Sequence, residues 1–472
     1  MAQEAKLARK LSLLDSVLLL AGGIIGSGVF LTAQKIALNT RTPLWFLLVW
    51  GIGMVITLLA CFAFAEMGAM FPNAGGQYVF LREAYGEFVA FLYGWMIFTV
   101  SNGGTIAALA TGFSLYIGVV FPALAANQVM LTLGQLTVHG HAITLALTRG
   151  HLVAVSAIGL LTVTNIFGVR AGATLQNVAT WVKFAAIAGF VLLGVILGRG
   201  SWSHYTTSLP ATAESPSLLA GMGVALIAVF WALDGWVYIT WVAGEVKNPE
   251  RNLPRSLVIG VLLVGSIYLA INAVYVYALP MVELAATETV AQTAAIAIFS
   301  SAVGRWLSMM IAISCFGAMA ACILSGARVY YAMAEDGVFF RALARVHPRW
   351  RTPVWSLLIQ GMWSSVLVLV LDYADLFTYV MFMMVLSYVL TVAALFVLRR
   401  KMPDAPRPYR CAGYPWLPAL YVAFGSIWAI NALWVERKDA LIGIGIVLVG
   451  APFYWYWRRR KKSAALAGVA AD

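Results

Sequence analysis

Two breaks in otherwise apolar segments are the places where this sequence can bind a small polar ligand. The first lies in the stretch 22–30, which reads GGIIGSGVF and places Gly26, Ser27 and Gly28 in the middle of an apolar run. Glycine lets a helix unwind without a steric penalty, and the N–H groups freed inside a bilayer must be satisfied by a cavity or a ligand. The helix that resumes near Val29 points its positive end at the break, which suits a carboxylate. The alternative explanation is close helix packing through small residues.

The second break lies in the apolar run 217–246, where the letters LDGW at 233–236 interrupt it. The helix before this break ends near Ala232. The free carbonyl groups at a helix C-terminus carry partial negative charge, which suits an ammonium group. One break therefore offers donors and the other offers acceptors. A ligand with a carboxylate and an ammonium group on adjacent atoms satisfies both, which predicts an α-amino acid.

Two side chains beside the second break have more than one interpretation. Trp231 can stack over the ligand as a gate, or it can be an ordinary buried aromatic residue. Asp234 can pair with a cationic ligand side chain, carry a proton, or cap the second half of the helix. Capping is the commonest of these roles for an Asp at such a position.

Lys183, in NVATWVKFAAI, is the one Lys deep inside an apolar run. A charge at that depth costs at least a few kcal/mol unless it is paired or hydrated. We therefore expect its ammonium group to contact carbonyl groups of the unwound segment at 26–28, in the place of a bound cation. The alternative is that the side chain extends to the membrane surface, although Lys183 lies far from both ends of its run.

The composition sets the class of fold that positions these residues. The chain has 472 residues, of which 62% are hydrophobic and 11% charged, whereas soluble domains carry about 25% charged residues. Apolar runs of about 20 residues recur along the whole chain, which predicts an all-α polytopic membrane protein. The predicted transmembrane helices are twelve, at residues 14–37, 43–70, 86–121, 151–168, 172–198, 217–246, 254–279, 302–334, 353–371, 374–399, 413–434 and 440–457.

The positive charges predict the orientation. Most of the 31 Lys and Arg residues lie before the first run, after the last one, or in the alternate loops between them. Cytoplasmic loops carry the excess of Lys and Arg. We therefore expect a multi-pass protein of the cell membrane with both termini in the cytoplasm.

The positions of the two breaks divide the chain into repeats. Each break lies in the first helix of a five-helix unit, 14–198 and 217–400, and an odd number of spans gives the two units opposite orientations. Interrupted helices at matching positions of two inverted units indicate the binding site of a secondary transporter. Helices 11 and 12, at 413–457, stand outside the repeat. We expect a cytoplasmic N-terminal tail at 1–13, before the first repeat, and a basic cytoplasmic C-terminal tail at 458–472, after helix 12.

Other classes of protein are disfavoured. The net charge of +12 is spread between apolar runs, so we expect no nucleic acid partner. The five His residues lie in loops or at span ends, and no Gly-rich phosphate-binding loop is present, so we expect no metal, no cofactor and no enzyme activity. No cysteine lies in a predicted external loop; the four are Cys61, Cys315, Cys322 and Cys411. A structural disulfide is therefore not expected.

Several motifs resemble those of the amino acid–polyamine–organocation superfamily, and most closely its L-type amino acid transporter branch. The motifs are GGIIGSGVF, FWALDGW, GEVKNPERNLPRS, ILSGARVYYAMAEDGVFF and VHPRWRTPVWSL, and the likeness covers nearly all of residues 10–400. The resemblance implies the LeuT-type fold of 5+5 inverted repeats with helices 1 and 6 broken. It also implies sodium-independent transport, often by exchange.

The resemblance implies a role for individual residues as well. Lys183 corresponds to the family Lys that stands where sodium-coupled relatives hold an ion, and Trp231 corresponds to the aromatic gate. Backbone groups bind the substrate: around Ile24, Gly26, Ser27 and Gly28 for its carboxylate, and the carbonyls of Ile24, Trp231 and Ala232 for its ammonium group.

Three departures from the L-type pattern bear on specificity and partners. Asp234 stands where that branch often has Gly, and Val237 where many eukaryotic members have Asn. The external Cys that joins eukaryotic members to an ancillary glycoprotein is absent from 122–150, so we expect a prokaryotic protein without a disulfide-linked subunit. We predict sodium-independent transport of L-amino acids, mainly neutral, by alternating access. The alternatives are proton-coupled or exchange transport of cationic amino acids or amines and, more remotely, a membrane enzyme or receptor.

Overall fold

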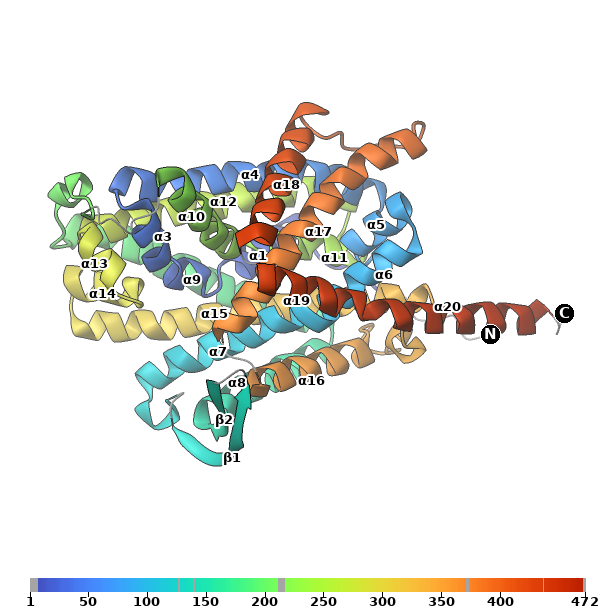
Figure 1. Ribbon diagram of the computed structural model, residues 1–472, viewed down its shortest axis with the longest axis horizontal. Helices are drawn as coiled ribbons and strands as arrows, with labels where there is room; N and C mark the ends of the chain where they lie inside the picture. The colour runs from blue at the N-terminus through green and yellow to red at the C-terminus, as the bar shows by residue number, and fades with distance from the viewer. Residues whose placement is uncertain are drawn as a thin grey trace.

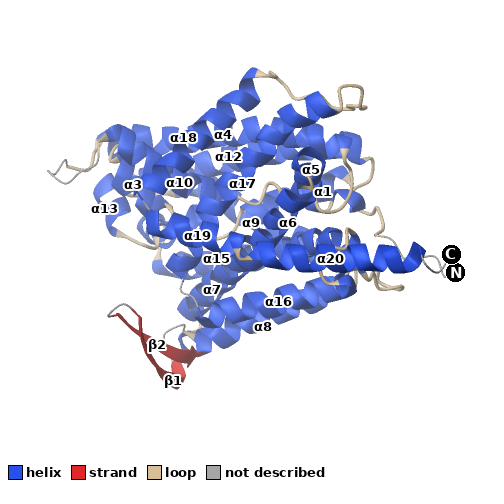
Figure 2. Ribbon diagram, turned by 45° about the vertical axis from the view of Figure 1, so that its right-hand side comes forward, coloured by secondary structure: helices blue, strands red, loops and turns tan. Residues whose placement is uncertain are grey.

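The computed structural model describes residues 7–125, 128–138, 141–210, 217–370, 373–435 and 437–469. Most of the long helices run along the long axis of the molecule (Figure 1). A single hairpin of two strands projects from one edge of this bundle in the described part of the chain (Figure 2). Both predicted tails extend beyond these ranges, at 1–6 and 470–472.

The helices of the predicted first repeat follow the apolar runs closely. They are α1 Leu13–Ile24, α2 Gly28–Leu31, α3 Ala33–Thr40, α4 Pro43–Met70, α5 Gln77–Tyr85, α6 Glu87–Met96, the π-helix η1 Ile97–Ser101, α7 Asn102–Val120, the 3-10 turn η2 Pro122–Leu124, α8 Arg149–Ile166 and α9 Val169–Leu197. Capping explains two of the starts. The Ser12 side chain accepts a hydrogen bond from Asp15 at the start of α1, and Thr42 precedes Pro43 at the first position of α4.

The rest of the chain is also helical. Its elements are η3 Trp202–Thr206, α10 Leu218–Leu233, α11 Tyr238–Trp241, η4 Ala243–Glu245, α12 Pro249–Ala278, α13 Met281–Ala286, α14 Val290–Ile298, α15 Ser301–Glu335, η5 Arg341–Ala344, α16 Val354–Val370, α17 Tyr373–Lys401, α18 Trp416–Val435, α19 Arg437–Leu448 and α20 Gly450–Val469. α20 continues past the predicted end of the last span, so residues 458–469 of the predicted tail are helical.

Nine helices in the described residues are long and apolar enough to cross a membrane. Three shorter apolar helices, Leu218–Leu233, Val354–Val370 and Trp416–Ile430, coincide with the predicted spans six, nine and eleven. The membrane class is therefore supported, and the count of twelve spans stays a prediction.

The expectation of an all-helical chain is wrong for the segment between α7 and α8. Strands β1 Val129–Val138 and β2 His141–Thr148 pair antiparallel, from Val129 with Thr148 to Val138 with His141. Every second residue of a strand faces the same side, and this stretch alternates apolar residues with Thr and Gln. That alternation is a strand signal that the search for apolar runs overlooks.

The contacts between helices follow a symmetry. When each helix of a contacting pair is replaced by its counterpart five predicted spans away, the new pair is also in contact. α4 packs on α12, α7 on α15 and α8 on α16, and each of these pairs joins a span with its counterpart. The contact of α1 with α12 matches that of α10 with α4, and the contact of α9 with α15 matches that of α17 with α7. This exchange is the pattern expected of two related five-helix units.

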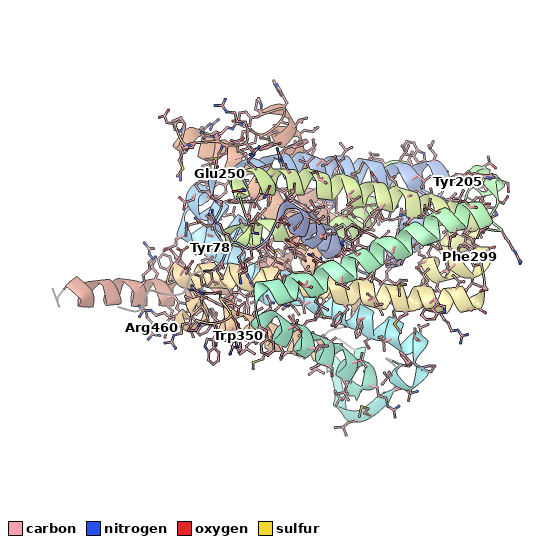
Figure 3. All side chains as sticks on the ribbon, turned by 180° about the vertical axis from the view of Figure 1, so that it is seen from behind. Tyr78, Tyr205, Glu250, Phe299, Trp350 and Arg460 are labelled. Carbon is pink, nitrogen blue, oxygen red and sulfur yellow. The ribbon has the colours of Figure 1, made fainter. Side chains whose placement is uncertain are left out.

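Loops that the charge pattern assigns to one side lie at one end of the bundle. Tyr78, Glu250, Trp350 and Arg460 lie at that end, and Tyr205 and Phe299 lie at the other (Figure 3). The segment before α1 lies at that end as well, because it pairs with the loop after η4: Leu11 and Val246 form a parallel bridge.

Glu66 joins the end of α4 to the end of α17 and to the loop that follows it. Its carboxylate is fully buried in α4 and accepts hydrogen bonds from Arg399 at 2.6 and 3.0 Å, from Arg407 at 3.2 Å and from the backbone N–H of Cys411 at 2.6 Å. A buried carboxylate with these partners is a structural group.

Candidate functional site

The first predicted break is present, and it lies at residues 25–27. α1 ends at Ile24 and α2 begins at Gly28, so three residues between them leave the helix. Ser27 precedes α2, and its side chain makes no capping hydrogen bond. All three residues are buried, so the freed backbone groups face the interior of the protein.

The second break spans residues 234–237, between α10 and α11. Gly235 has φ +103°, which favours glycine, and a Cβ there would lie 2.9 Å from the backbone carbon and oxygen of Gly23. A Cβ on Gly28 would lie 2.6 Å from the Cα of Ala232. The two breaks therefore touch through their backbones, and the glycines serve both explanations given above: they unwind the helices and they allow close packing.

A cavity lies between the two breaks and collects most of the predicted site residues. Its lining comprises Gly23, Ile24, Gly26, Ser27, Gly28, Thr105, Leu109, Trp231, Asp234 and Tyr238. Ala232 is predicted for the site and is not part of this lining. Its carbonyl group instead faces α12, where it meets the hydroxyl of Tyr268.

Tyr268 joins the ends of both half-helices and was not found from the sequence. Its buried hydroxyl lies 3.1 Å from the carbonyl oxygen of Ile24 and 3.1 Å from that of Ala232. A hydroxyl carries one proton, so it donates to one carbonyl at a time. The carbonyl oxygen of Ile24 also accepts from the backbone N–H of Gly26 at 2.8 Å, so a ligand ammonium group that binds there takes the place of the Tyr268 donor.

Lys183 reaches the unwound segment. Its Nζ donates to the carbonyl oxygen of Gly22 at 2.9 Å and to that of Ile25 at 2.6 Å. Ser314 in α15 also donates to the carbonyl of Ile25, at 2.9 Å, and lies 3.2 Å from that of Gly26. Among the described residues, no carboxylate forms an ion pair with Lys183. The alternative in which this side chain extends to the membrane surface is therefore wrong.

Trp231 lies in the last turn of α10 and is 8% exposed. It forms part of the cavity wall and of the hydrophobic core. Its position is compatible with a gate and with core packing, so the gating role stays a prediction.

The capping interpretation of Asp234 is wrong. The residue that precedes α11 is Val237, and no side chain caps this helix. The break is four residues long, so Asp234 stands at the end of α10 rather than at the start of α11. Its carboxylate instead accepts a hydrogen bond of 2.5 Å from the hydroxyl of Tyr388 in α17.

A second, polar cavity adjoins the first and shares Thr105, Asp234 and Tyr238 with it. The other residues of its lining include Gln77, Ser101, Asn102, Ser387 and Tyr388. Ser101 and Asn102 lie where the π-helix η1 meets α7, and such π-bulges are frequent at functional sites. This cavity could not be inferred from the sequence, because its side chains come from helices far apart along the chain.

Two breaks with opposite polarity, a shared cavity and an ammonium group on the unwound backbone are what a carrier of small zwitterions requires. A model of the amino acid permease family matches residues 11–454. The chain belongs to this family. Amino acid permeases are transporters rather than enzymes, so the prediction that this chain is not an enzyme is confirmed, as is its place in the amino acid–polyamine–organocation superfamily.

The permease has relatives along almost its whole length. It is 32% identical over 461 residues to the serine/threonine exchanger SteT of Bacillus subtilis, covering 97% of this chain and 98% of that protein. It is 29% identical over 464 residues to the large neutral amino acids transporter small subunit 2 of Rattus norvegicus, covering 97% and 82%. It is 26% identical over 453 residues to the b(0,+)-type amino acid transporter 1 of Mus musculus, covering 95% and 88%.

Proposed function

We propose that this permease is a sodium-independent exchanger or facilitator of L-amino acids in the cell membrane. The observation that carries the proposal is the contact of the Lys183 ammonium group with the carbonyl oxygens of Gly22 and Ile25. These carbonyls are otherwise available to a cation, and a fixed ammonium group satisfies them in every step of the cycle. A protein built in this way has no need of sodium to close the unwound part of its first helix.

The substrate binds as a zwitterion between the two breaks. N–H groups at the start of α2 attract its carboxylate, and carbonyl groups at the end of α1 and of α10 accept hydrogen bonds from its ammonium group. Tyr268 links the carbonyls of Ile24 and Ala232 and so fixes the ends of α1 and α10 relative to one another. Alternating access then follows from rocking one part of the bundle against the rest around this site.

We propose neutral amino acids as the main substrates, with small polar side chains among them. The lining of the cavity beside the site includes the hydroxyl groups of Ser101 and Thr105, and the Thr105 oxygen can accept a hydrogen bond from a substrate because its proton is donated to the carbonyl of Ser101. Sites that hydrogen-bond a substrate hydroxyl discriminate strongly against analogues that lack it. The name of the relative in Bacillus subtilis, a serine/threonine exchanger, fits this chemistry.

Transport of cationic amino acids is the second candidate, and Asp234 favours it. Its carboxylate lines both cavities and faces Tyr388 rather than the backbone of α11. A cationic side chain that enters the polar cavity would meet this carboxylate.

Topology and partners complete the proposal. The exchange of helix contacts between 14–198 and 217–400 supports the LeuT-type arrangement of 5+5 inverted repeats, and the charge pattern supports cytoplasmic termini. All four cysteines of the chain are buried as free thiols. This supports a permease that works in the lipid bilayer without a disulfide-linked ancillary subunit.

Uptake into liposomes tests the function. Purified permease is reconstituted with unlabelled serine inside, and entry of labelled serine is measured in sodium and in choline buffers, with leucine and arginine as competitors. We expect equal uptake in both buffers and strong competition by neutral amino acids. Uptake that requires sodium would overturn sodium independence. Uptake that does not depend on internal serine would identify a facilitator rather than an exchanger.

A further inference from the structure

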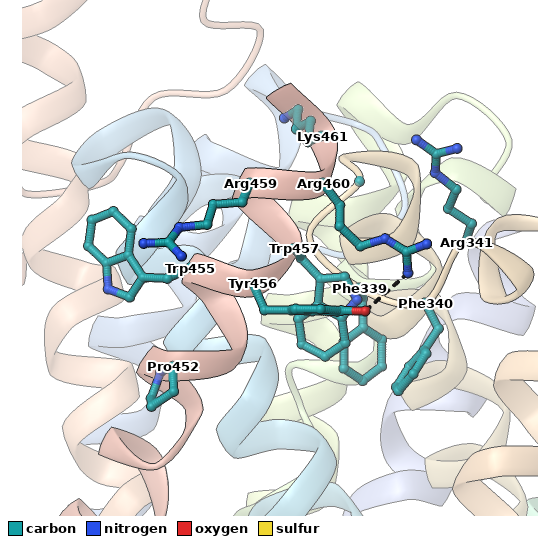
Figure 4. Close-up of a pocket in the computed structure, with 11 residues that line it drawn as sticks. Phe339, Phe340, Arg341, Pro452, Trp455, Tyr456, Trp457, Arg459, Arg460 and Lys461 are labelled. Carbon is teal, nitrogen blue, oxygen red and sulfur yellow. Dashed lines mark hydrogen bonds between the residues drawn. The ribbon is translucent and has the colours of Figure 1, made fainter. Parts of the chain in front are cut away.

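A basic, aromatic groove lies away from the substrate site, where α20 passes the end of α15. It has a volume of about 940 Å³, and eleven residues form it (Figure 4). One face of α20 supplies Pro452, Trp455, Tyr456 and Arg459, at the spacing of neighbouring turns of a helix. The segment that follows α15 supplies the opposite wall, from Gly337 to Arg341.

The charges that face this groove are positive. The lining contains four cations, Arg341, Arg459, Arg460 and Lys461, and no acidic residue. Glu87 lies next to the groove and pairs with Lys461 at 2.5 Å, which offsets one of the four. No carboxylate among the described residues forms an ion pair with Arg341 or Arg460.

Two of these cations, Arg341 and Arg460, lie on opposite walls of the groove. The side chains of Arg341 and Arg460 point to the same side of the groove, although they come from different elements (Figure 4). Arg460 is held by a hydrogen bond of 3.2 Å to the hydroxyl of Tyr456. Like charges at close range repel one another, and an anion between them removes that repulsion.

The groove lies at one end of the last apolar span, which is the expected level of the membrane surface. The last apolar span of the described residues is Leu441–Lys461, so its basic residues stand at the end of a membrane-spanning segment. Trp455 and Tyr456 are 50% and 54% exposed, and half-exposed aromatic rings are typical of the boundary between lipid and water. On the side of the membrane core, Val449 and Phe453 are exposed apolar residues of the same region.

We propose that this groove binds the head group of an anionic phospholipid, from the leaflet at the Arg460 end of the bundle. The phosphate lies between Arg341 and Arg460, the aromatic rings contact the glycerol region, and the acyl chains run along the exposed apolar surface below. Basic groups next to a membrane span attract anionic lipids at about 1 kcal/mol for each Lys or Arg. The site is separate from the cavity between the breaks, so the proposal does not depend on the transported substrate.

Native mass spectrometry of the full-length permease in detergent tests the proposal. The protein is titrated with phosphatidylglycerol and, separately, with phosphatidylcholine, and retained lipid is counted. The double variant Arg341→Gln/Arg460→Gln removes two charges from the groove. The matched control Arg349→Gln/Arg458→Gln removes two charges nearby, since Arg349 is exposed and Arg458 lies over the rings of Tyr454 and Trp455 outside the lining.

We expect wild type and the control to retain phosphatidylglycerol in preference to phosphatidylcholine, and the groove variant, which lacks two basic groups, to bind phosphatidylglycerol about thirtyfold more weakly. An equal loss of phosphatidylglycerol binding in both double variants would mean that the lipid responds to the overall charge of the protein, and it would overturn the proposal. Equal retention of the two lipids by wild type would mean that no head-group site exists, and it would overturn the proposal as well. Displacement by glycerol phosphate at the same concentrations would assign the groove to a soluble anion and overturn it too. If the double variant does not fold, the single variant Arg460→Gln against Arg458→Gln gives the same comparison.

Discussion

The hydroxyl of Tyr388 donates a hydrogen bond of 2.5 Å to the carboxylate of Asp234, and this bond ties α17 to the break between α10 and α11. Asp234 lines both cavities at the centre of the permease. Its charge is therefore available to a substrate side chain, in contrast to the capping role that the sequence favoured.

Replacing these two residues separates charge from hydrogen bonding. If cationic amino acids are substrates as well, we expect Asp234→Asn to abolish competition by arginine and lysine while neutral amino acids still compete, because Asn keeps the size and removes the charge. Tyr388→Phe removes the donor and leaves the carboxylate, so competition by arginine should be kept. The measurement is inhibition of labelled serine uptake in liposomes. If arginine competes equally well against wild type and Asp234→Asn, the carboxylate does not contact the substrate side chain.

The glycines of the first break differ in what a methyl group would meet. A Cβ on Gly28 would lie 2.6 Å from the Cα of Ala232, whereas a Cβ on Gly26 would lie 2.9 Å from the end of the Leu109 side chain. A side-chain end can move, but the backbone of the opposite break cannot move without separating the two half-helices. We expect Gly28→Ala to reduce uptake more than tenfold and Gly26→Ala to reduce it mildly.

The control for this pair is the stability of the folded protein. Overpacking typically costs about 1–3 kcal/mol, so thermal unfolding of both variants in detergent is measured beside uptake. Normal uptake by Gly28→Ala would show that the close contact of the two breaks is not needed for transport.

Tyr268 should position the carbonyl groups that accept the substrate ammonium. Tyr268→Phe removes the donor shared by Ile24 and Ala232 and leaves two buried carbonyls with fewer partners. A lost hydrogen bond of this kind costs about 1 kcal/mol. We expect substrate binding, measured by calorimetry, to weaken about fivefold. Unchanged affinity in a folded variant would mean that the carbonyl groups are aligned by the helices alone.

Trp231 should contact the bound substrate. We expect Trp231→Ala to weaken substrate binding by about 1–3 kcal/mol, because a full aromatic contact is lost, and Trp231→Phe to weaken it less. Calorimetry gives the affinities. If both variants bind substrate as wild type does, Trp231 belongs to the core that it also joins.

The features that the sequence predicted are local, and those it missed are tertiary. Both breaks and the depth of Lys183 follow from residues within a few positions of one another, and the structure contains each of them. The roles of Tyr268, Ser314 and Tyr388 depend on which helices pack together, and no local pattern distinguishes them from other buried polar residues. Asp234 was misjudged for a related reason: its partner is Tyr388 of α17, which is far away along the chain.

Lys183 provides the sharpest test of the proposed function, because Ser314 shares one of its acceptors. Both side chains donate to the carbonyl oxygen of Ile25, and Lys183 also donates to that of Gly22. Lys183→Met keeps most of the length and removes the ammonium group. The carbonyl of Gly22 then loses this donor, and that of Ile25 keeps the weaker hydroxyl, at a cost of about 1–3 kcal/mol for each unsatisfied group. We expect uptake by Lys183→Met to fall sharply while the protein remains folded in size-exclusion chromatography.

Ser314→Ala is the matched control, and it should keep most of its activity because the ammonium group still holds both carbonyls. Wild type should transport equally in sodium and choline. A Lys183→Met variant that transports normally would show that the unwound carbonyls need no fixed cation, and recovery of its transport by sodium would instead show that the ammonium group occupies an ion site.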